Sequence, residues 1–165
     1  MKGLFLRLVG VFLTLSVSVS FVFLLSACRE YKSPYPLMLE FCQSYGISDT
    51  VFSSSVSEGE AGYVSESFFE QVYGEKPECV SEYAVVFLSS LDVAGECALF
   101  LCYSEYDALI ACDILQIRLD LIKSMGISID TSYAKDAVIF KSGRYAVMCV
   151  LSDNERAKRL WQKIL

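Results

Sequence analysis

The residues best placed to undergo a chemical reaction lie at positions 25–28, which read Leu-Ser-Ala-Cys. They follow a basic start that contains Lys2 and Arg7, and an uncharged apolar run over residues 8–24. A basic start, an apolar core and small residues at its end are typical of a secretory signal peptide. Cys28 directly follows these small residues, so its thiol is the group that we expect to carry a covalent attachment.

This tetrapeptide resembles the lipobox of bacterial lipoproteins. The resemblance implies that residues 1–27 are a cleaved signal peptide and that Cys28 is the lipidated N-terminus. The alternative is an uncleaved membrane helix, because 17 residues at about 1.5 Å each span roughly 26 Å, near the lower limit for crossing a bilayer. Three serines dilute the apolar run: Ser16, Ser18 and Ser20. Both interpretations place the rest of the chain on the extracytoplasmic face of the cell membrane.

Few other residues indicate chemistry. The chain contains no histidine, which excludes the commonest Ser/His/Asp and Cys/His nucleophile systems. Carboxylates close in sequence could serve glycoside hydrolysis: Glu58 with Glu60, and Glu105 with Asp107. The first pair falls in an expected loop and the second at an expected helix start, where solvation and capping explain them. We therefore predict no catalytic residues.

Two large side chains within apolar segments have a structural and a functional interpretation. Arg118 interrupts the segment Ile114-Leu-Gln-Ile-Arg-Leu. It could be buried against a carboxylate or carbonyl partner and mark a site, but we favour a position along the helix flank with its head in water. Trp161 is interpreted as a core residue rather than a ligand platform.

Six cysteines remain beside Cys28: Cys42, Cys79, Cys97, Cys102, Cys112 and Cys149. Without a C-x-x-C pair or a histidine, we expect no metal site and no cofactor. Cys97 and Cys102 should point to opposite faces of one strand and cannot bridge each other. A cross-strand pair such as Cys102 with Cys149 is possible, and whether any cysteines form disulfides stays open.

Charge is unevenly distributed. Beyond residue 27 the chain has 12 basic and 20 acidic residues, which makes a nucleic-acid partner improbable. Residues 28–110 carry a formal charge of −11 and residues 111–165 carry +3. We favour two differently solvated faces of one domain over an acidic patch for a cationic partner.

The pattern of apolar residues, caps and glycines predicts a tether over residues 28–36 and a loop over residues 53–62. It predicts helices at 37–45, 67–73, 105–125 and from 153 onward. It predicts strands at 82–89, 97–103, 136–141 and 144–151. A box of Ser67 and Glu70 should cap the second helix. Most of the surface of helix 105–125 should be buried against a sheet, with one face formed by Tyr106, Ile110, Ile114, Ile117 and Leu121.

We therefore expect a single α+β domain over residues 37–165. Its core should be a ββαββα unit, a four-stranded antiparallel sheet with the helices packed on one face.

From residue 67 onward the layout resembles a domain family of unknown function found in lipoproteins of Gram-positive, Firmicutes-type bacteria. The features that carry the resemblance are a helix ending in Tyr73-Gly74, strands at Glu82-Tyr-Ala-Val-Val and Ala98-Leu-Phe-Leu, a helix with Arg118, and the turn Lys141-Ser-Gly-Arg-Tyr145 before Ala146-Val-Met. The resemblance implies a small exported lipoprotein and supplies no activity.

Together these observations predict a membrane-anchored lipoprotein with a non-enzymatic binding or envelope-associated domain. Its partner would be a protein, a peptide or a cell-wall component, for instance through strand addition at a sheet edge. The alternative is a small carboxylate-dependent cell-wall hydrolase. A solute receptor is disfavoured, because two-lobed receptors need about twice this length.

Overall fold

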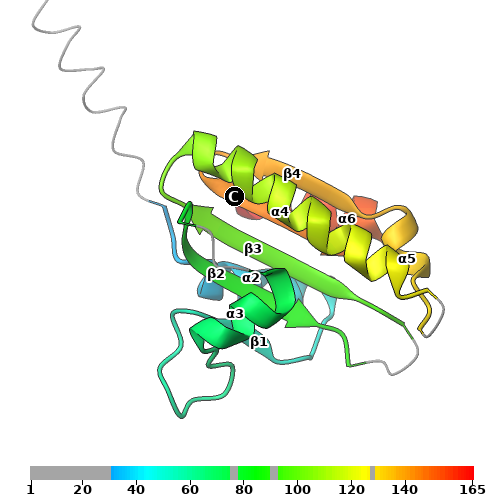
Figure 1. Ribbon diagram of the computed structural model, residues 1–165, viewed down its shortest axis with the longest axis horizontal. Coiled ribbons are helices and arrows are strands. Elements are labelled where there is room, and N and C mark those ends of the chain that lie inside the picture. Colours follow the sequence, from blue (N-terminus) through cyan, green and yellow to red (C-terminus); the bar gives the residue numbers. More distant parts are fainter. Residues whose placement is uncertain (1–30, 75–77, 90–92, 127–128) are drawn as a thin grey trace, which may run out of the picture. The chain divides into compact units, whose positions relative to one another are not determined.

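A computed structural model describes residues 31–165 of the chain, apart from 75–77, 90–92 and 127–128 (Figure 1). Residues 32–165 form one compact unit. The predicted signal peptide and Cys28 lie outside the described residues. The elements are α2 (Pro34–Tyr45), β1 (Val51–Ser53), α3 (Glu66–Tyr73), β2 (Val80–Phe87), β3 (Glu96–Cys102), α4 (Glu105–Ser124), α5 (Ser132–Lys135), β4 (Val138–Ser142), β5 (Tyr145–Val150) and α6 (Asn154–Ile164).

The strands form one antiparallel sheet in the order β1-β2-β3-β5-β4. The predicted α+β class, the four strands β2, β3, β4 and β5, and their antiparallel pairing are confirmed. The count of four strands is wrong, because β1 adds a fifth strand beside β2, with Val51 opposite Val86. The sequence predicts a loop from residue 53 onward, so it misses this short strand.

Helices cover both faces of the sheet, which corrects the expected single covered face. In Figure 1, α3 and α4 lie in front of the sheet, and α2 and α6 lie behind it. Every residue of β3 and β5 is buried. Because successive side chains of a strand point to opposite faces, full burial requires cover on both sides. Alternate residues of these strands join the core under α3 and α4: Ala98, Phe100, Cys102, Ala146, Met148 and Val150.

Local sequence explains where the first helices begin and end. Pro34 lies in the first turn of α2, where its missing N–H costs no hydrogen bond, and Gly46 ends the helix with a φ of 94°. The predicted tether is therefore too long, since residues 34–36 are helical. Helix α3 is capped by Ser65, whose side chain accepts a hydrogen bond from the Phe68 N–H, rather than by Ser67.

Helix α4 has the predicted position, with Ser104 as its cap, but not the predicted buried face. Its buried side belongs to Ala108, Ala111, Leu115, Leu119 and Ile122. The large apolar side chains expected in the core are exposed, for example Tyr106 at 71% and Ile117 at 69%. No helix within the described residues is long and apolar enough to cross a membrane.

On the other face of the sheet, α2 and α6 pack against each other through aromatic rings. Trp161 is fully buried and stacks on Phe41, with ring centroids 4.5 Å apart and planes inclined by 5°. The Tyr45 hydroxyl accepts a hydrogen bond from the Asp153 N–H, which fixes the start of α6 against the end of α2. Trp161 is thus a core residue, as the sequence predicts.

Candidate functional site

The most unusual polar group of the described residues is the carboxylate of Glu96. Glu96 begins β3 and is only 2% exposed. Its neighbour Cys97 points to the α2 and α6 side of the sheet, so the Glu96 side chain points toward α3 and α4. Few charged side chains are buried in proteins unless they are paired, and this one is paired.

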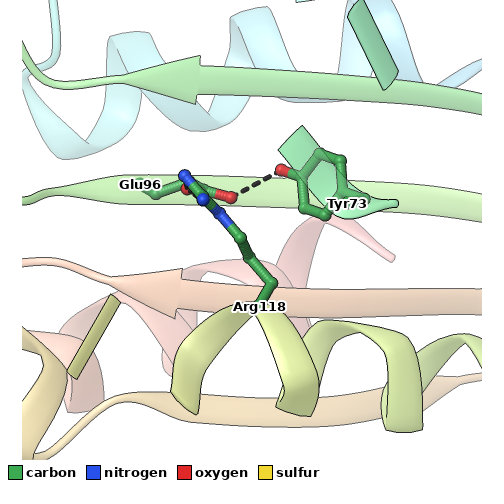
Figure 2. A network of polar contacts seen from close by, with 3 residues as sticks. All are labelled: Tyr73, Glu96 and Arg118. Atoms are coloured by element: carbon green, nitrogen blue, oxygen red, sulfur yellow. Dashed lines mark hydrogen bonds and ion pairs between the residues drawn. The ribbon is translucent and has the colours of Figure 1, made fainter. Parts of the chain in front are cut away.

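Both carboxylate oxygens of Glu96 have partners from other elements (Figure 2). Arg118 of α4 donates to Oε2 from Nε at 3.0 Å and from Nη2 at 2.7 Å. The Tyr73 hydroxyl of α3 donates to Oε1 at 2.5 Å. The guanidinium carbon of Arg118 also lies 5.8 Å from the centre of the Tyr73 ring, within range of a cation–π contact. We call these three residues the Glu96 network.

Electrostatics keep the tyrosine of this network protonated. Burial raises the pKa of the Tyr73 hydroxyl well above its ordinary value, and the neighbouring Glu96 carboxylate raises it further. A protonated Tyr73 can continue to donate to Glu96. The hydroxyl is therefore a fixed donor rather than a base.

The geometry suits a structural role better than a catalytic one. Tyr73 and Arg118 together occupy both oxygens of Glu96, so no lone carboxylate faces a substrate. The network joins α3, β3 and α4 through three residues that lie 22 or more positions apart in the sequence. It therefore fixes the angle at which the two helices cross the sheet.

Of the charged pair in this network, the sequence singles out Arg118 but not Glu96. Arg118 was expected along the helix flank with its head in water, and that preference is wrong, since its side chain is 14% exposed and ion-paired. The less favoured interpretation, a carboxylate partner, is the observed one. Glu96 itself was not singled out. Its signal was a single carboxylate at the head of the apolar run Cys-Ala-Leu-Phe-Leu-Cys.

The candidate carboxylate pairs do not meet in a cleft. Glu58 and Glu60 are exposed in the loop that follows β1. Glu105 is exposed and forms an ion pair with Lys141 at 2.9 Å, while Asp107 accepts a hydrogen bond from Ser104 at the start of α4. Both pairs thus have the solvation and capping roles expected for them.

A shallow pocket of about 670 Å³ lies where α5 approaches the start of α6. Several of its polar groups already serve the fold. Asn154 accepts a hydrogen bond from the Leu151 N–H and donates to the Tyr133 carbonyl, and Asp153 accepts from the Arg156 N–H. The pocket also carries carboxylates from Asp136, Asp153 and Glu155.

The cysteines lie on both faces of the sheet. Cys97 and Cys149 are direct cross-strand partners, with Sγ atoms 3.8 Å apart. Cys102 lies on the α4 side, opposite Val80 of β2, so the pairing of Cys102 with Cys149 that the sequence allowed is wrong. In the part of the chain that the structure describes, no group of three or more His, Cys, Asp or Glu side chains could hold a metal ion.

Comparison with protein-family models, with curated proteins and with solved structures yields no match to this chain. The resemblance to a lipoprotein domain family and the lipidation of Cys28 therefore stay predictions. The geometry of the described residues is the remaining guide to function.

Proposed function

We propose that this chain is a lipoprotein, anchored through a lipid on Cys28 to the extracytoplasmic face of the cell membrane, where it acts as a non-catalytic binding domain. One observation carries the proposal. The compact unit spans residues 32–165, so all of it lies on the C-terminal side of Cys28. Cleavage before Cys28 would leave the folded domain whole.

The distance between anchor and domain would be short. The Lys32 carbonyl accepts a hydrogen bond of 2.8 Å from the Tyr145 hydroxyl. Three residues lie between Cys28 and Lys32, and the four steps along an extended chain reach at most about 14 Å. A short segment of chain would thus connect the lipid to the domain.

Residues 32 and 33, which follow the proposed anchor in sequence, are hydrogen-bonded to one end of the sheet. Tyr145 and Glu82 both lie opposite Leu101 in the sheet, near the end of β3. Tyr145 holds Lys32, and the Ser33 hydroxyl donates to Glu82 at 2.7 Å. The chain therefore enters the compact unit at this end of the sheet, where β3 leads into α4.

The outward face of α4 is the surface best suited to bind a partner. It and its flanks hold most of the large exposed apolar side chains of the described residues: Tyr103, Tyr106, Leu109, Ile110, Ile117, Leu121 and Met125. Contiguous exposed apolar surface commonly marks an interaction site. Asp113 and Asp120 are exposed on the same helix, so the face suits a partner segment with apolar residues flanked by lysine or arginine.

The anchor is tested by replacing Cys28 with alanine in a bacterial host that exports lipoproteins. We expect the unchanged chain to float with membrane vesicles and to yield an N-terminal peptide with the mass of a diacylglyceryl cysteine. Cys28→Ala should lose both properties, whereas Cys42→Ala should keep them. Unaltered processing and flotation of Cys28→Ala would contradict the proposal.

The contact surface is tested with a photo-reactive amino acid placed at Ile117 of the anchored protein. A defined adduct with one envelope protein is expected at this position, with a basic and apolar segment at the cross-linked site. The control position is Leu39 of α2, which is also apolar and 44% exposed but lies on the other side of the sheet. Equal adducts at both positions, or none at Ile117, would rule out α4 as the binding face.

A further inference from the structure

We propose that Cys97 and Cys149 form a disulfide bond that joins β3 to β5 when the exported chain folds. This inference rests on the extracytoplasmic location proposed above, because disulfides form and persist in oxidising compartments. Its geometric basis is independent of that location.

The register of the sheet places the two cysteines at a suitable pair of positions. The Cys102 N–H donates to the Arg144 carbonyl at 2.9 Å, and these two residues are directly opposite each other in the register of β3 and β5. Hydrogen-bonded and non-hydrogen-bonded pairs alternate along an antiparallel ladder. Cys97, five residues before Cys102, therefore forms a non-hydrogen-bonded pair with Cys149.

Non-hydrogen-bonded pairs bring side chains closest together. Their Cα atoms are about 4.5 Å apart, and a disulfide requires a Cα separation of about 4.4–6.8 Å. The Sγ atoms of Cys97 and Cys149 already approach to 3.8 Å. Small rotations about the side-chain bonds, without movement of either strand, would close the remaining distance to a bond of about 2.05 Å.

The surroundings indicate when the bond would form. Cys97 and Cys149 are both fully buried, on the face that α2 and α6 cover. Burial and the adjacent Cys149 thiol raise the pKa of Cys97 well above its ordinary value, so the folded protein holds little of the Cys97 thiolate, and burial also keeps an oxidant away from both sulfurs. Oxidation would accordingly precede the docking of α2 and α6 on the sheet.

The oxidant required is a disulfide donor, either a thiol–disulfide oxidoreductase or a small-molecule disulfide. One cysteine thiolate attacks the donor and forms a mixed disulfide, which releases the first donor thiol. The second cysteine then attacks its partner's sulfur and releases the second donor thiol. The two cysteines lose two electrons to the donor. The two protons that they lose are carried by the two donor thiols that form.

The other buried cysteines provide controls. Cys42 belongs to α2 rather than to the sheet, and Cys102 lies on the opposite face. Neither is a cross-strand partner of Cys97 or Cys149. The proposal therefore specifies one linkage among the six cysteines of the described residues.

The test starts from the full chain in detergent, reduced and unfolded, and refolds it with glutathione disulfide. Free thiols are then alkylated under denaturing conditions, and digested peptides are analysed by mass spectrometry. We expect the peptides containing Cys97 and Cys149 to be linked and to lack the alkyl group. Recovery of both residues as alkylated thiols would overturn the proposal. Refolding in solution needs no export, so failure of the membrane anchor would leave this result unchanged.

A second measurement compares the thermal midpoint of protein refolded with the disulfide donor and with a reductant. A bridge closing a loop of this length should raise the midpoint by roughly 5–15 °C. Cys42→Ala should retain the difference and Cys149→Ala should abolish it. A difference that survives in Cys149→Ala would assign the stabilisation to another linkage and contradict ours.

Discussion

At the scale of single residues, the Glu96 network shows how a buried charge is tolerated in an apolar core. Removing a carboxylate and a guanidinium from water is costly, and the cost is recovered only when every charged atom finds a partner. Glu96 meets this condition, because Arg118 and Tyr73 together donate to both of its oxygens. Loss of either charge would leave the other buried without compensation.

Replacing Glu96 with glutamine tests this dependence with little change in volume. We expect Glu96→Gln to lower the free energy of unfolding by about 3–5 kcal/mol, because Arg118 would keep its charge without a carboxylate. Denaturation by urea measures the change. The matched control is Glu105→Gln, which removes the exposed carboxylate paired with Lys141 and should cost at most about 1 kcal/mol. Equal losses would show that burial does not govern the Glu96 pair.

At the scale of elements, α4 shows the limit of reading a buried face from apolar periodicity. Apolar side chains lie on nearly every side of this helix, so spacing alone did not define one face. Small residues at Ala108 and Ala111 allow close approach to the sheet, and Leu115 fills the centre of the contact. The larger Tyr106 and Ile117 would not fit that close contact and point outward.

Two substitutions in α4 distinguish its faces. Leu115→Ala should lower the free energy of unfolding by about 2–5 kcal/mol, since it leaves a cavity under the helix. Ile117→Ala removes a similar apolar side chain from the exposed face and should change stability by no more than about 0.5 kcal/mol. Chemical denaturation of both variants gives the comparison. A larger loss for Ile117→Ala would restore the face that the sequence favoured.

Strand β1 was missed for a related reason. Its three residues, Val51–Ser53, are too few for an alternating pattern to be recognised. Pairing with β2 defines the strand, and the loop that follows returns to it, with the Ser53 N–H donating to the Gly62 carbonyl. Gly62 is suited to this return because its φ is +90° and a Cβ there would collide with the Val51 carbonyl oxygen.

At the scale of the whole molecule, buried thiols should lower the free energy of unfolding at alkaline pH. Burial raises the pKa of Cys42 and of Cys102 to about 12. In the unfolded chain both thiols return to an ordinary value of about 9. Between these values the folded protein keeps protons that the unfolded chain releases. Their stabilising contribution is therefore complete below pH 9 and is lost as the pH rises toward 12.

We expect the free energy of unfolding to fall above pH 9, by up to about 1.4 kcal/mol per pH unit for each of these thiols. Cys42→Ala should make this decline less steep, because one titrating group is removed. Val51→Ala, which removes a buried side chain that does not titrate, should lower stability equally at all pH values. Denaturation series between pH 8 and 11 measure the slopes, and identical slopes for Cys42→Ala and the unchanged chain would refute the assignment.

The sequence by itself determined the features that depend on neighbouring residues. Caps, glycines and local periodicity set the ends of α4 and the hairpin of β4 and β5, and the resemblance of residues 25–28 to a lipobox predicts the anchor. Tertiary structure decided what depends on distant residues: the pairing of β1, the cover on both faces, the outward face of α4, and the meetings of Glu96 with Arg118 and of Cys97 with Cys149. Such contacts follow from strand register and helix docking, which minimise exposed surface and unpaired charge over the whole chain, so no single segment encodes them.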